Sequence, residues 1–539
     1  MNYNIVAQTT ESTVVAEYTP LPRKADAYQS EAALEKELIS LLTAQGYEYL
    51  AIHDEKALIT NLRKQLELLN GYVFSDSEWE QFFSECIAGK NDGIVEKTRR
   101  IQDDYIQILR RDNGSTKNIY LVDKRNIHNN RLQVINQYTT AEGTHKNRYD
   151  VTVLVNGLPM VYISNSNAGA SLFGRRSIDQ PLPAESFCGL GAFEYVQIFV
   201  ISNGTNTKYY SNSTRFNHIR EAAASGKSGK GKTSHSFEFT SFWADAQNRI
   251  IPDLMDFTKT FFSKHTLLNL LTRYCVFTAE NMLLVMRPYQ IAATERILSK
   301  LEIANNYKTY GTIAGGGYIW HTTGSGKTLT SFKTAQIASK LPYIDKVLFV
   351  VDRKDLDYQT MKEYDRFEKG AANSNTSTAV LQRQLEVRDR RGNPHAYKII
   401  ITTIQKLSTF IKKNPTHAVY QKRVVIIFDE CHRSQFGDMH TAITKHFKKY
   451  HLFGFTGTPI FAVNAPHNGK PTMKTTPQVF GGEPDKDGKR VLPLHTYTIV
   501  DAINDKNVLP FRVDYIKPWT RNRILTTSRS KTSTGKRPF

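Results

Sequence analysis

Residues 318–328 read Tyr-Ile-Trp-His-Thr-Thr-Gly-Ser-Gly-Lys-Thr, and this stretch decides the fold of the second half of the chain. Its apolar start predicts a strand, its glycines predict a tight turn, and the run 329–341 is compatible with a helix. In such a strand–loop–helix unit, backbone N–H groups and the positive helix end hold nucleotide phosphates. Lys327 would reach the β- and γ-phosphates, and the Thr328 hydroxyl would ligate Mg²⁺. We therefore expect an ATP site formed by Thr323, Gly324, Ser325, Gly326, Lys327 and Thr328.

A competing phosphate-loop motif lies upstream. The strict pattern G-x-x-x-x-G-K-[ST] fits Gly226 to Thr233 (GKSGKGKT) letter for letter, whereas His321 stands where 318–328 would need the first glycine. No apolar strand precedes Gly226, and the alternating residues after Thr233 predict a strand rather than a helix N-terminus. We interpret this stretch as a flexible basic loop.

Composition indicates a globular chain with an anionic partner. A length of 539 residues suggests two to four domains, and 40% apolar with 23% charged residues is typical of folded proteins. No apolar run is long enough for a membrane span, and the N-terminus lacks the pattern of a signal peptide, so we expect a cytoplasmic protein. The formal charge of +20 fits either a nucleic-acid partner or a generally basic surface. The cysteines lack the pair spacing of zinc or disulfide frameworks; they are Cys86, Cys188, Cys275 and Cys431.

The order of predicted elements divides the chain. A helix is predicted from an N-cap at Ser30, and residues 149–163 predict a β-hairpin with Asn-Gly at its turn. Another strand is predicted at 194–202. From about residue 285, apolar strands alternate with helices, which predicts an α/β domain with a doubly wound parallel sheet and a ligand at the carboxyl ends of its strands. The predicted strands are 318–320, 346–351, 398–402, 424–428 and 452–455.

An acid pair follows one of these strands. Residues 424–432, Val-Val-Ile-Ile-Phe-Asp-Glu-Cys-His, read as a buried strand that ends in two carboxylates. Asp429 would hold Mg²⁺, directly or through water, and Glu430 would polarise the attacking water. The alternative is a strand that ends in an ordinary helix cap.

Two further segments belong to the same predicted edge of the sheet. Gly-Phe-Thr-Gly-Thr-Pro (454–459) follows a strand and offers the hydroxyls of Thr456 and Thr458 near the acids. Met-Arg-Pro-Tyr-Gln (286–290) precedes the phosphate loop, and the Gln290 amide could read the edge of adenine.

Taken together, these motifs resemble the first RecA-like domain of superfamily 2 helicases and translocases. Their exact residues are similar to those of the restriction subunit of type I restriction–modification enzymes. The motifs are RPYQ (287–290), HTTGSGKT (321–328), FVVDRKDLDYQT (349–360), ITTIQKL (401–407), FDECH (428–432, a DECH box) and GFTGTP (454–459). The resemblance implies ATP and Mg²⁺ at Lys327, Thr328, Asp429 and Glu430. It also implies coupling of hydrolysis to motion by Thr456 and Thr458, and DNA-backbone contacts near Arg353 and Thr403.

The same family carries an N-terminal endonuclease domain of the PD-(D/E)xK type, in which two carboxylates hold Mg²⁺ and a lysine assists. Residues 28–31, 97–101, 147–152 and 155–159 resemble that domain, and Asp150 stands in the place of the first acid. Where the family continues Glu-x-Lys, this chain has Ser-Asn-Ser (164–166). We interpret 164–188 as a segment read in another frame, with a variable loop of some 25 residues as the alternative. Either way, we predict no DNA cleavage by this chain.

The resemblance also implies a domain plan and partners. We expect a lead-in (1–27), an endonuclease-like mixed-sheet domain (28–265), a first RecA-like domain (266–470), a linker with the start of a second RecA-like domain (471–519), and a disordered basic tail (520–539). Without a complete second lobe, the chain would bind ATP and turn it over slowly.

The implied activity is ATP-driven translocation of double-stranded DNA with endonucleolytic cleavage. The implied partners are the modification (methyltransferase) and specificity subunits, with no membrane. Two alternatives stay open: a non-catalytic remnant that binds ATP and DNA, and a superfamily 2 translocase outside restriction.

Overall fold

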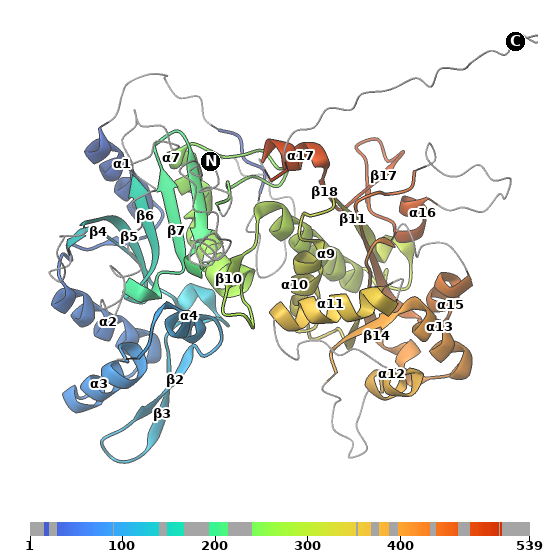
Figure 1. The fold of residues 1–539 in the computed structure, drawn as a ribbon, viewed down its shortest axis with the longest axis horizontal. Helices are drawn as coiled ribbons and strands as arrows, with labels where there is room; N and C mark the ends of the chain where they lie inside the picture. The colour runs from blue at the N-terminus through green and yellow to red at the C-terminus, as the bar shows by residue number, and fades with distance from the viewer. Residues whose placement is uncertain are drawn as a thin grey trace, which may run out of the picture.

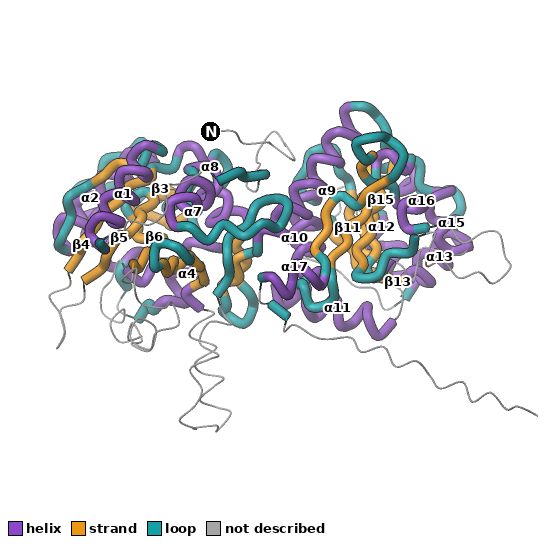
Figure 2. The backbone as a smooth tube through the Cα atoms, turned by 90° about the horizontal axis from the view of Figure 1, so that it is seen from above, coloured by secondary structure: helices purple, strands orange, loops and turns teal. Residues whose placement is uncertain are grey.

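The computed structural model describes most of the chain as two α/β lobes that lie side by side (Figure 1). The N-terminal elements form one lobe, and the elements from α9 (Pro288–Asn306) onward form the other. The described residues are 16–20, 30–89, 91–139, 148–165, 193–213, 240–351, 354–367, 377–386, 397–431, 438–461, 475–505 and 507–508. Each lobe has a sheet with helices packed around it (Figure 2).

The N-terminal lobe is built on a mixed six-stranded sheet in the order β1-β4-β5-β6-β7-β8. Its strands are β1 (Glu48–Tyr49), β4 (Leu132–Thr139), β5 (Arg148–Val155), β6 (Leu158–Asn165), β7 (Ile198–Ser202) and β8 (Thr207–Ser211). The pairs β1/β4 and β6/β7 are parallel and the other neighbours are antiparallel. A separate hairpin joins β2 (Ile106–Arg110) to β3 (Thr116–Tyr120). The helices are α1 (Glu31–Ala44), α2 (Glu55–Asn70), α3 (Asp76–Phe82), α4 (Ile94–Gln102), α7 (Leu254–Phe261) and α8 (Lys264–Asn269).

Local sequence chemistry explains several of these boundaries. Ser30 caps α1 as predicted, because its hydroxyl accepts a hydrogen bond from the Ala33 N–H. The predicted hairpin is β5 and β6, and its turn residues Asn156 and Gly157 have φ of 52° and 82°, the left-handed values that a two-residue hairpin turn requires. The strand predicted at 194–202 is shorter, since it begins at Ile198.

The second lobe contains a fully parallel six-stranded sheet in the order β13-β12-β14-β15-β11-β18. Its strands are β11 (Gly317–His321), β12 (Lys346–Val351), β13 (Ile399–Thr403), β14 (Arg423–Phe428), β15 (Lys449–Thr456) and β18 (His495–Tyr497). Five of these confirm the predicted strands. The helices are α9, α10 (Lys327–Ala338), α11 (Lys354–Phe367), α12 (Thr378–Leu385), α13 (Ile404–Lys413), α15 (Asp438–His446), α16 (Thr476–Phe480) and α17 (Ile499–Asn504). The short antiparallel pair β16 (Glu483–Pro484) with β17 (Val491–Leu492) completes this lobe. The pair β9 (Cys275–Phe277) with β10 (Leu283–Val285) contacts α4 and β8 of the N-terminal lobe.

The chain is therefore an α/β protein with an N-terminal mixed-sheet domain followed by a RecA-like parallel-sheet domain, as expected. Strands β12 and β14 are buried along almost their whole length, since helices cover both faces of the sheet. This is why these strands read as continuous apolar runs rather than as alternating patterns.

The domain plan differs from the structure at two places. One hydrophobic core extends from Tyr18 to Ala292, so the boundary expected at 265/266 does not coincide with a break in packing. Strand β18 pairs with β11 at the edge of the parallel sheet, although its residues were expected in a linker to a second lobe. The backbone N–H and C=O groups along the outer edge of β11 provide the hydrogen-bonding partners for β18. The sequence does not reveal this pairing, because a strand of three residues carries too short a pattern.

Several expectations fall outside the described residues. The upstream motif Gly226 to Thr233, most of the segment 164–188 and the tail 520–539 belong to this group; only residues 164 and 165 of that segment are described, at the end of β6. Every helix in the described part of the chain is too short or too polar to cross a lipid bilayer.

Candidate nucleotide site

The phosphate loop lies between β11 and α10, as the sequence predicted. β11 ends at His321 and α10 begins at Lys327, with Gly326 at the N-cap position in a left-handed conformation (φ 74°). The first N–H groups of a helix have no acceptors within the helix, so the start of α10 presents donors and a partial positive charge. This arrangement suits a phosphate.

The loop is held in shape by its own polar groups. The Ser325 hydroxyl donates to the Thr322 carbonyl (2.6 Å), and the Thr330 hydroxyl donates to the Gly326 carbonyl (3.1 Å). Gly457, from the 454–459 segment, lies against the loop, since a Cβ built on it would be 3.4 Å from the carbonyl oxygen of His321. The loop is thus packed beside the end of β15.

The acid pair lies at the carboxyl end of β14 and faces the loop. Lys327 Nζ is 3.4 Å from Glu430 Oε1, and the Lys327 side chain is almost fully buried. Glu430 has a φ of 43°, an unusual value for a non-glycine residue that re-aims the chain at the end of the strand. Two residues 103 positions apart in the sequence are therefore brought together at one edge of the sheet.

Burial and the neighbouring Glu430 carboxylate raise the pKa of Asp429 to about 6. A carboxylate whose charge is disfavoured in this way gains from a nearby cation, because the cation offsets both effects. Among the described residues no group of three or more His, Cys, Asp or Glu side chains could hold a metal. Mg²⁺ in a nucleotide site takes one or two protein oxygens together with phosphates and water. The expectation that Thr328 and Asp429 supply them stays a prediction.

The threonines of the 454–459 segment lie at the carboxyl end of β15. Thr456 is fully buried at the end of β15, and its hydroxyl accepts a hydrogen bond from the Thr458 N–H (3.0 Å). Its neighbour across the sheet is Trp320 on β11. A coupling role for Thr456 and Thr458 stays a prediction.

Gln290 differs from its expected role. Its amide nitrogen donates to the Ser325 carbonyl (3.0 Å), and its amide oxygen accepts from the Arg287 N–H (3.0 Å) at the start of α9. The side chain is buried and both ends of the amide are occupied. In this conformation Gln290 supports the phosphate loop, and reading adenine would require it to exchange these hydrogen bonds.

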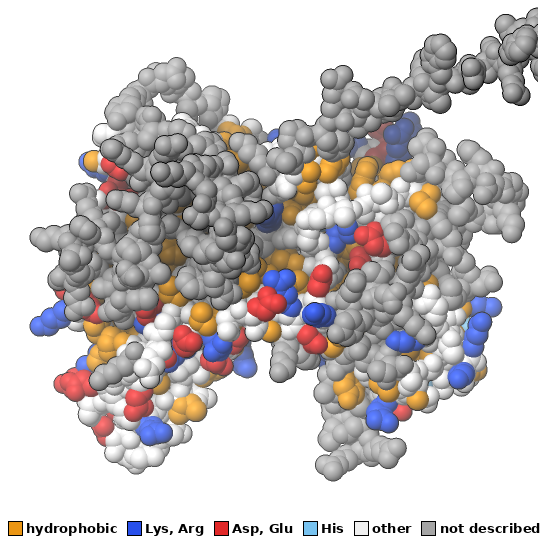
Figure 3. Space-filling view, viewed as in Figure 1, with side chains coloured by type: hydrophobic (Ala, Val, Ile, Leu, Met, Phe, Trp, Pro, Cys, Tyr) orange, Lys and Arg blue, Asp and Glu red, His pale blue; other side chains and the backbone are white. Residues whose placement is uncertain are grey.

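The two expected DNA-contact residues have different outcomes. Arg353 falls outside the described residues. Thr403 is fully buried, and its hydroxyl caps α13 by accepting from the Lys406 N–H (3.2 Å). It is therefore inaccessible to DNA in this structure, since the last residue of the edge strand β13 is also the buried N-cap of α13. On the face drawn in Figure 3, acidic and basic side chains of the described residues are interspersed.

The two strands that resemble the endonuclease motif, β5 and β6, are antiparallel neighbours in the sheet. Val151 pairs with Ile163, so the same register brings Asp150 opposite Ser164. Ser164, the residue at which the resemblance leads us to expect an acid, carries a hydroxyl instead; that the nuclease site is incomplete stays a prediction. Ser164 continues β6 and pairs with Ile201 on β7. The strand therefore extends past Ile163, after which the resemblance to the family motif ends.

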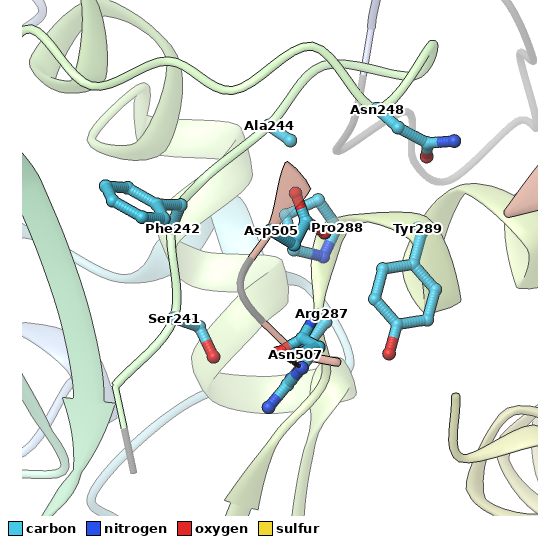
Figure 4. A pocket seen from close by; sticks show the side chains of 9 residues that line it. All are labelled: Ser241, Phe242, Ala244, Asn248, Arg287, Pro288, Tyr289, Asp505 and Asn507. Atoms are coloured by element: carbon cyan, nitrogen blue, oxygen red, sulfur yellow. Dashed lines mark hydrogen bonds between the residues drawn. The ribbon is translucent and has the colours of Figure 1, made fainter. Parts of the chain in front are cut away.

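A small pocket lies next to the phosphate loop, between the two lobes (Figure 4). Arg287 and Asn507 contact each other across it through a hydrogen bond. Tyr289 lines it and donates from its hydroxyl to the Ser325 carbonyl (2.9 Å). The lining residues are Ser241, Phe242, Ala244, Asn248, Arg287, Pro288, Tyr289, Asp505 and Asn507.

Sequence reasoning missed two supports of the loop. The Tyr289 ring stacks on Tyr497 of β18, with centroids 3.7 Å apart. His321 Nε2 is 2.9 Å from His495 Nδ1, and both rings are buried. The only hint in the sequence was the departure of His321 from the glycine of the strict motif.

Comparison with known proteins gives two family matches. Residues 28–218 match the model described as the N terminus of the type I restriction enzyme R protein, and residues 289–532 match the SWI2/SNF2 ATPase model. One match falls in each lobe.

Individual relatives agree with the family models. The chain is 45% identical over 301 residues to the type I restriction enzyme EcoprrI endonuclease subunit of Escherichia coli, covering 55% of this chain and 90% of that protein. It is 39% identical over 498 residues to the SsaAORF53P endonuclease subunit of Staphylococcus saprophyticus, covering 91% of this chain and 47% of the relative. The chain thus spans about half the length of several curated relatives. A solved SWI2/SNF2 ATPase core of Sulfolobus solfataricus with double-stranded DNA matches at 19% identity with a TM-score of 0.24, over 35% of this chain and 34% of that one.

Proposed function

Because the chain belongs to the family of type I restriction enzyme endonuclease subunits, we propose that it binds ATP with Mg²⁺ and acts as the motor-bearing part of such an enzyme. The observation that supports this best is the meeting of Lys327 and Glu430 at the N-terminus of α10. A cation, an acid and a set of free N–H donors in one place are the parts that phosphoryl transfer to water needs.

Each residue has a definite task in this proposal. The N–H groups at the start of α10 bind the phosphates, and Lys327 exchanges its contact with Glu430 for the terminal phosphate oxygens. Thr328 and Asp429 hold Mg²⁺, which when bound neutralises the phosphate charge. Glu430, released from Lys327, accepts a proton from the attacking water. Gln290 keeps the loop in its binding shape.

We further propose that the partner of the motor is double-stranded DNA and that hydrolysis drives translocation. The modification and specificity subunits of the same system would supply the target site. The match of residues 28–218 to an R-protein N terminus argues against a translocase outside restriction.

For cleavage we propose a different outcome. Asp150 faces Ser164 rather than an acid, so this lobe would lack the second carboxylate that metal-assisted hydrolysis requires. With respect to the nuclease reaction, the chain is then a non-catalytic relative of its family.

The ATP proposal is tested by a pair of matched lysine variants. Titration with ATP and Mg²⁺ in a calorimeter should show binding to the natural chain and to Lys232→Ala, which alters the upstream motif. Lys327→Ala should abolish measurable binding. Equal loss in both variants, or loss only in Lys232→Ala, would refute the choice of loop.

The cleavage proposal is tested with supercoiled plasmid and Mg²⁺. The natural chain should leave the plasmid intact. Nicking that disappears in Asp150→Ala would show that the lobe cuts DNA without the missing acid.

A further inference from the structure

Two buried histidines connect the phosphate loop to the last strand of the sheet. His321 closes β11 immediately before the loop, and His495 opens β18, 174 residues later. Their rings meet through Nε2 of His321 and Nδ1 of His495 at 2.9 Å. Their relative exposures are 0% and 4%, so the pair makes its hydrogen bonds away from bulk water.

The surroundings determine where the ring protons lie. Burial, the neighbouring ring and Lys327 lower the pKa of His321 well below its usual value, and burial lowers the pKa of His495 to about 3. Both shifts favour the neutral form of the ring. The backbone of Ala246 acts in the opposite direction and favours the charged form of His495, as a nearby carbonyl does. Because Nδ1 of His495 faces His321, Nε2 is the ring nitrogen left to face Ala246.

A single arrangement of protons follows from this. With its proton on Nε2, His495 accepts at Nδ1, so His321 must donate from Nε2. The other nitrogen of His321, Nδ1, has no hydrogen-bond partner among the described residues, as expected for the ring nitrogen without a proton. The chain of donors thus runs in one direction, from His321 through His495 to Ala246.

Strand β18 supports the phosphate loop at further points. The Thr322 N–H, the first of the loop, donates to the Tyr497 carbonyl (2.8 Å). Tyr289, which donates to the Ser325 carbonyl, stacks on the Tyr497 ring. The position of the loop therefore depends on the position of β18.

The N-terminal lobe holds β18 through one turn, residues 244–250. Asp245 stiffens this turn, because its Oδ1 accepts from the N–H groups of Gln247 and Arg249, each at 2.9 Å. The Asn248 amide donates to the Thr496 carbonyl (2.8 Å). The turn thus contacts β18 at Thr496 and, through Ala246, at His495.

We propose that His321 and His495 are positioning residues of the ATP site, and that they link the phosphate loop to the turn 244–250 of the N-terminal lobe. The inference rests on the proposed ATP binding. It predicts that nucleotide binding at the loop changes the hydrogen exchange of the turn 244–250, because the two ring nitrogens of His495 connect the loop to this turn.

Three substitutions of His495 separate the two links. His495→Asn keeps an acceptor near the Nδ1 position and so keeps the contact with His321. His495→Gln keeps a donor near the Nε2 position and so keeps the contact with Ala246. His495→Leu removes both. His321→Gln, with a donor in place of Nε2, is the conservative control.

Two measurements are made on each variant of the full chain: ATP affinity by calorimetry, and hydrogen exchange of residues 240–251 with and without ATP and Mg²⁺. We expect ATP to slow exchange in this segment of the natural chain and of His321→Gln. His495→Leu and His495→Gln should bind ATP about three- to tenfold more weakly, the effect of one hydrogen bond. His495→Asn should retain affinity but lose the ATP-dependent protection of 240–251.

The outcomes distinguish this inference from the proposed function. If the natural chain does not bind ATP, the proposed function fails and this inference fails with it. If the natural chain binds ATP but exchange at 240–251 does not respond, or if His495→Leu keeps both affinity and protection, only the positioning role is overturned. Exchange of 320–326 without nucleotide shows whether His495→Leu still folds.

Discussion

The two glycines of the phosphate loop offer a sharp test of how Gln290 supports the site. Gly324 and Gly326 both have left-handed backbones, with φ of 79° and 74°. A Cβ built on Gly324 meets no atom within 4 Å, whereas one built on Gly326 lies 2.5 Å from the Gln290 amide nitrogen. Alanine at either position therefore carries the same backbone strain, and alanine at 326 alone displaces Gln290.

The expected magnitudes follow from these contacts. A left-handed backbone costs an alanine about 1–2 kcal/mol relative to glycine. Displacing Gln290 also breaks its hydrogen bonds to Ser325 and Arg287 and leaves buried groups without partners, which costs about 1–3 kcal/mol more. We expect Gly324→Ala to destabilise the loop and α10 by about 1–2 kcal/mol, and Gly326→Ala by about 2–5 kcal/mol.

Native-state hydrogen exchange of the α10 amides measures this opening free energy locally, which suits a chain with two lobes. The difference between the two variants should shrink to within about 0.5 kcal/mol when both are made in a Gln290→Ala background, because the displaced group is then absent. Equal costs in the natural background, or a difference that persists without the Gln290 amide, would refute the reasoning.

Three further predictions concern other parts of the molecule. Glu430→Gln should lower the rate of ATP hydrolysis, measured as phosphate release, at least about 100-fold, because the general base is lost. ATP affinity should be retained, because Lys327 is freed from Glu430; loss of ATP binding would contradict this. Burial lowers the pKa of His451 to about 4, so between pH 6.5 and about pH 4 the unfolded chain binds more protons than the folded chain. Stability should therefore fall as the pH falls through this window, by up to about 1.4 kcal/mol per pH unit, and His451→Phe should flatten the pH dependence of the urea midpoint. Lys97 and Glu194 form a buried ion pair, so Glu194→Ala should destabilise the N-terminal lobe by about 3–5 kcal/mol in thermal unfolding, and replacing both with methionine should cost clearly less.

Much of the second lobe could be predicted because its chemistry is local. The strand β14 is a buried apolar run, and its two acids follow it directly, so periodicity and length place them at the edge of a sheet. The Asn156-Gly157 turn and the Ser30 cap are likewise decided by residues within a few positions of each other. The serine at 164, where the family resemblance leads us to expect an acid, is likewise visible in the sequence, and the register of β5 and β6 brings it opposite Asp150.

Contacts between distant segments could not be predicted in this way. The sequence placed Gln290 near the nucleotide, but only packing shows that both ends of its amide are already bonded to backbone groups. Thr403 ends a strand as expected, and burial by the surrounding helices removes it from the surface.

The sequence by itself determined the strand–loop–helix unit at 318–328, the acid pair and the parallel sheet, because short-range periodicity and turn chemistry specify them. Only the tertiary structure decided that β18 joins this sheet, and that His321 meets His495 across 174 residues. The physical reason is that a strand edge and a buried hydrogen bond acquire their partners from the whole fold. The three residues of β18 form too short a sequence pattern to predict that the strand pairs with β11.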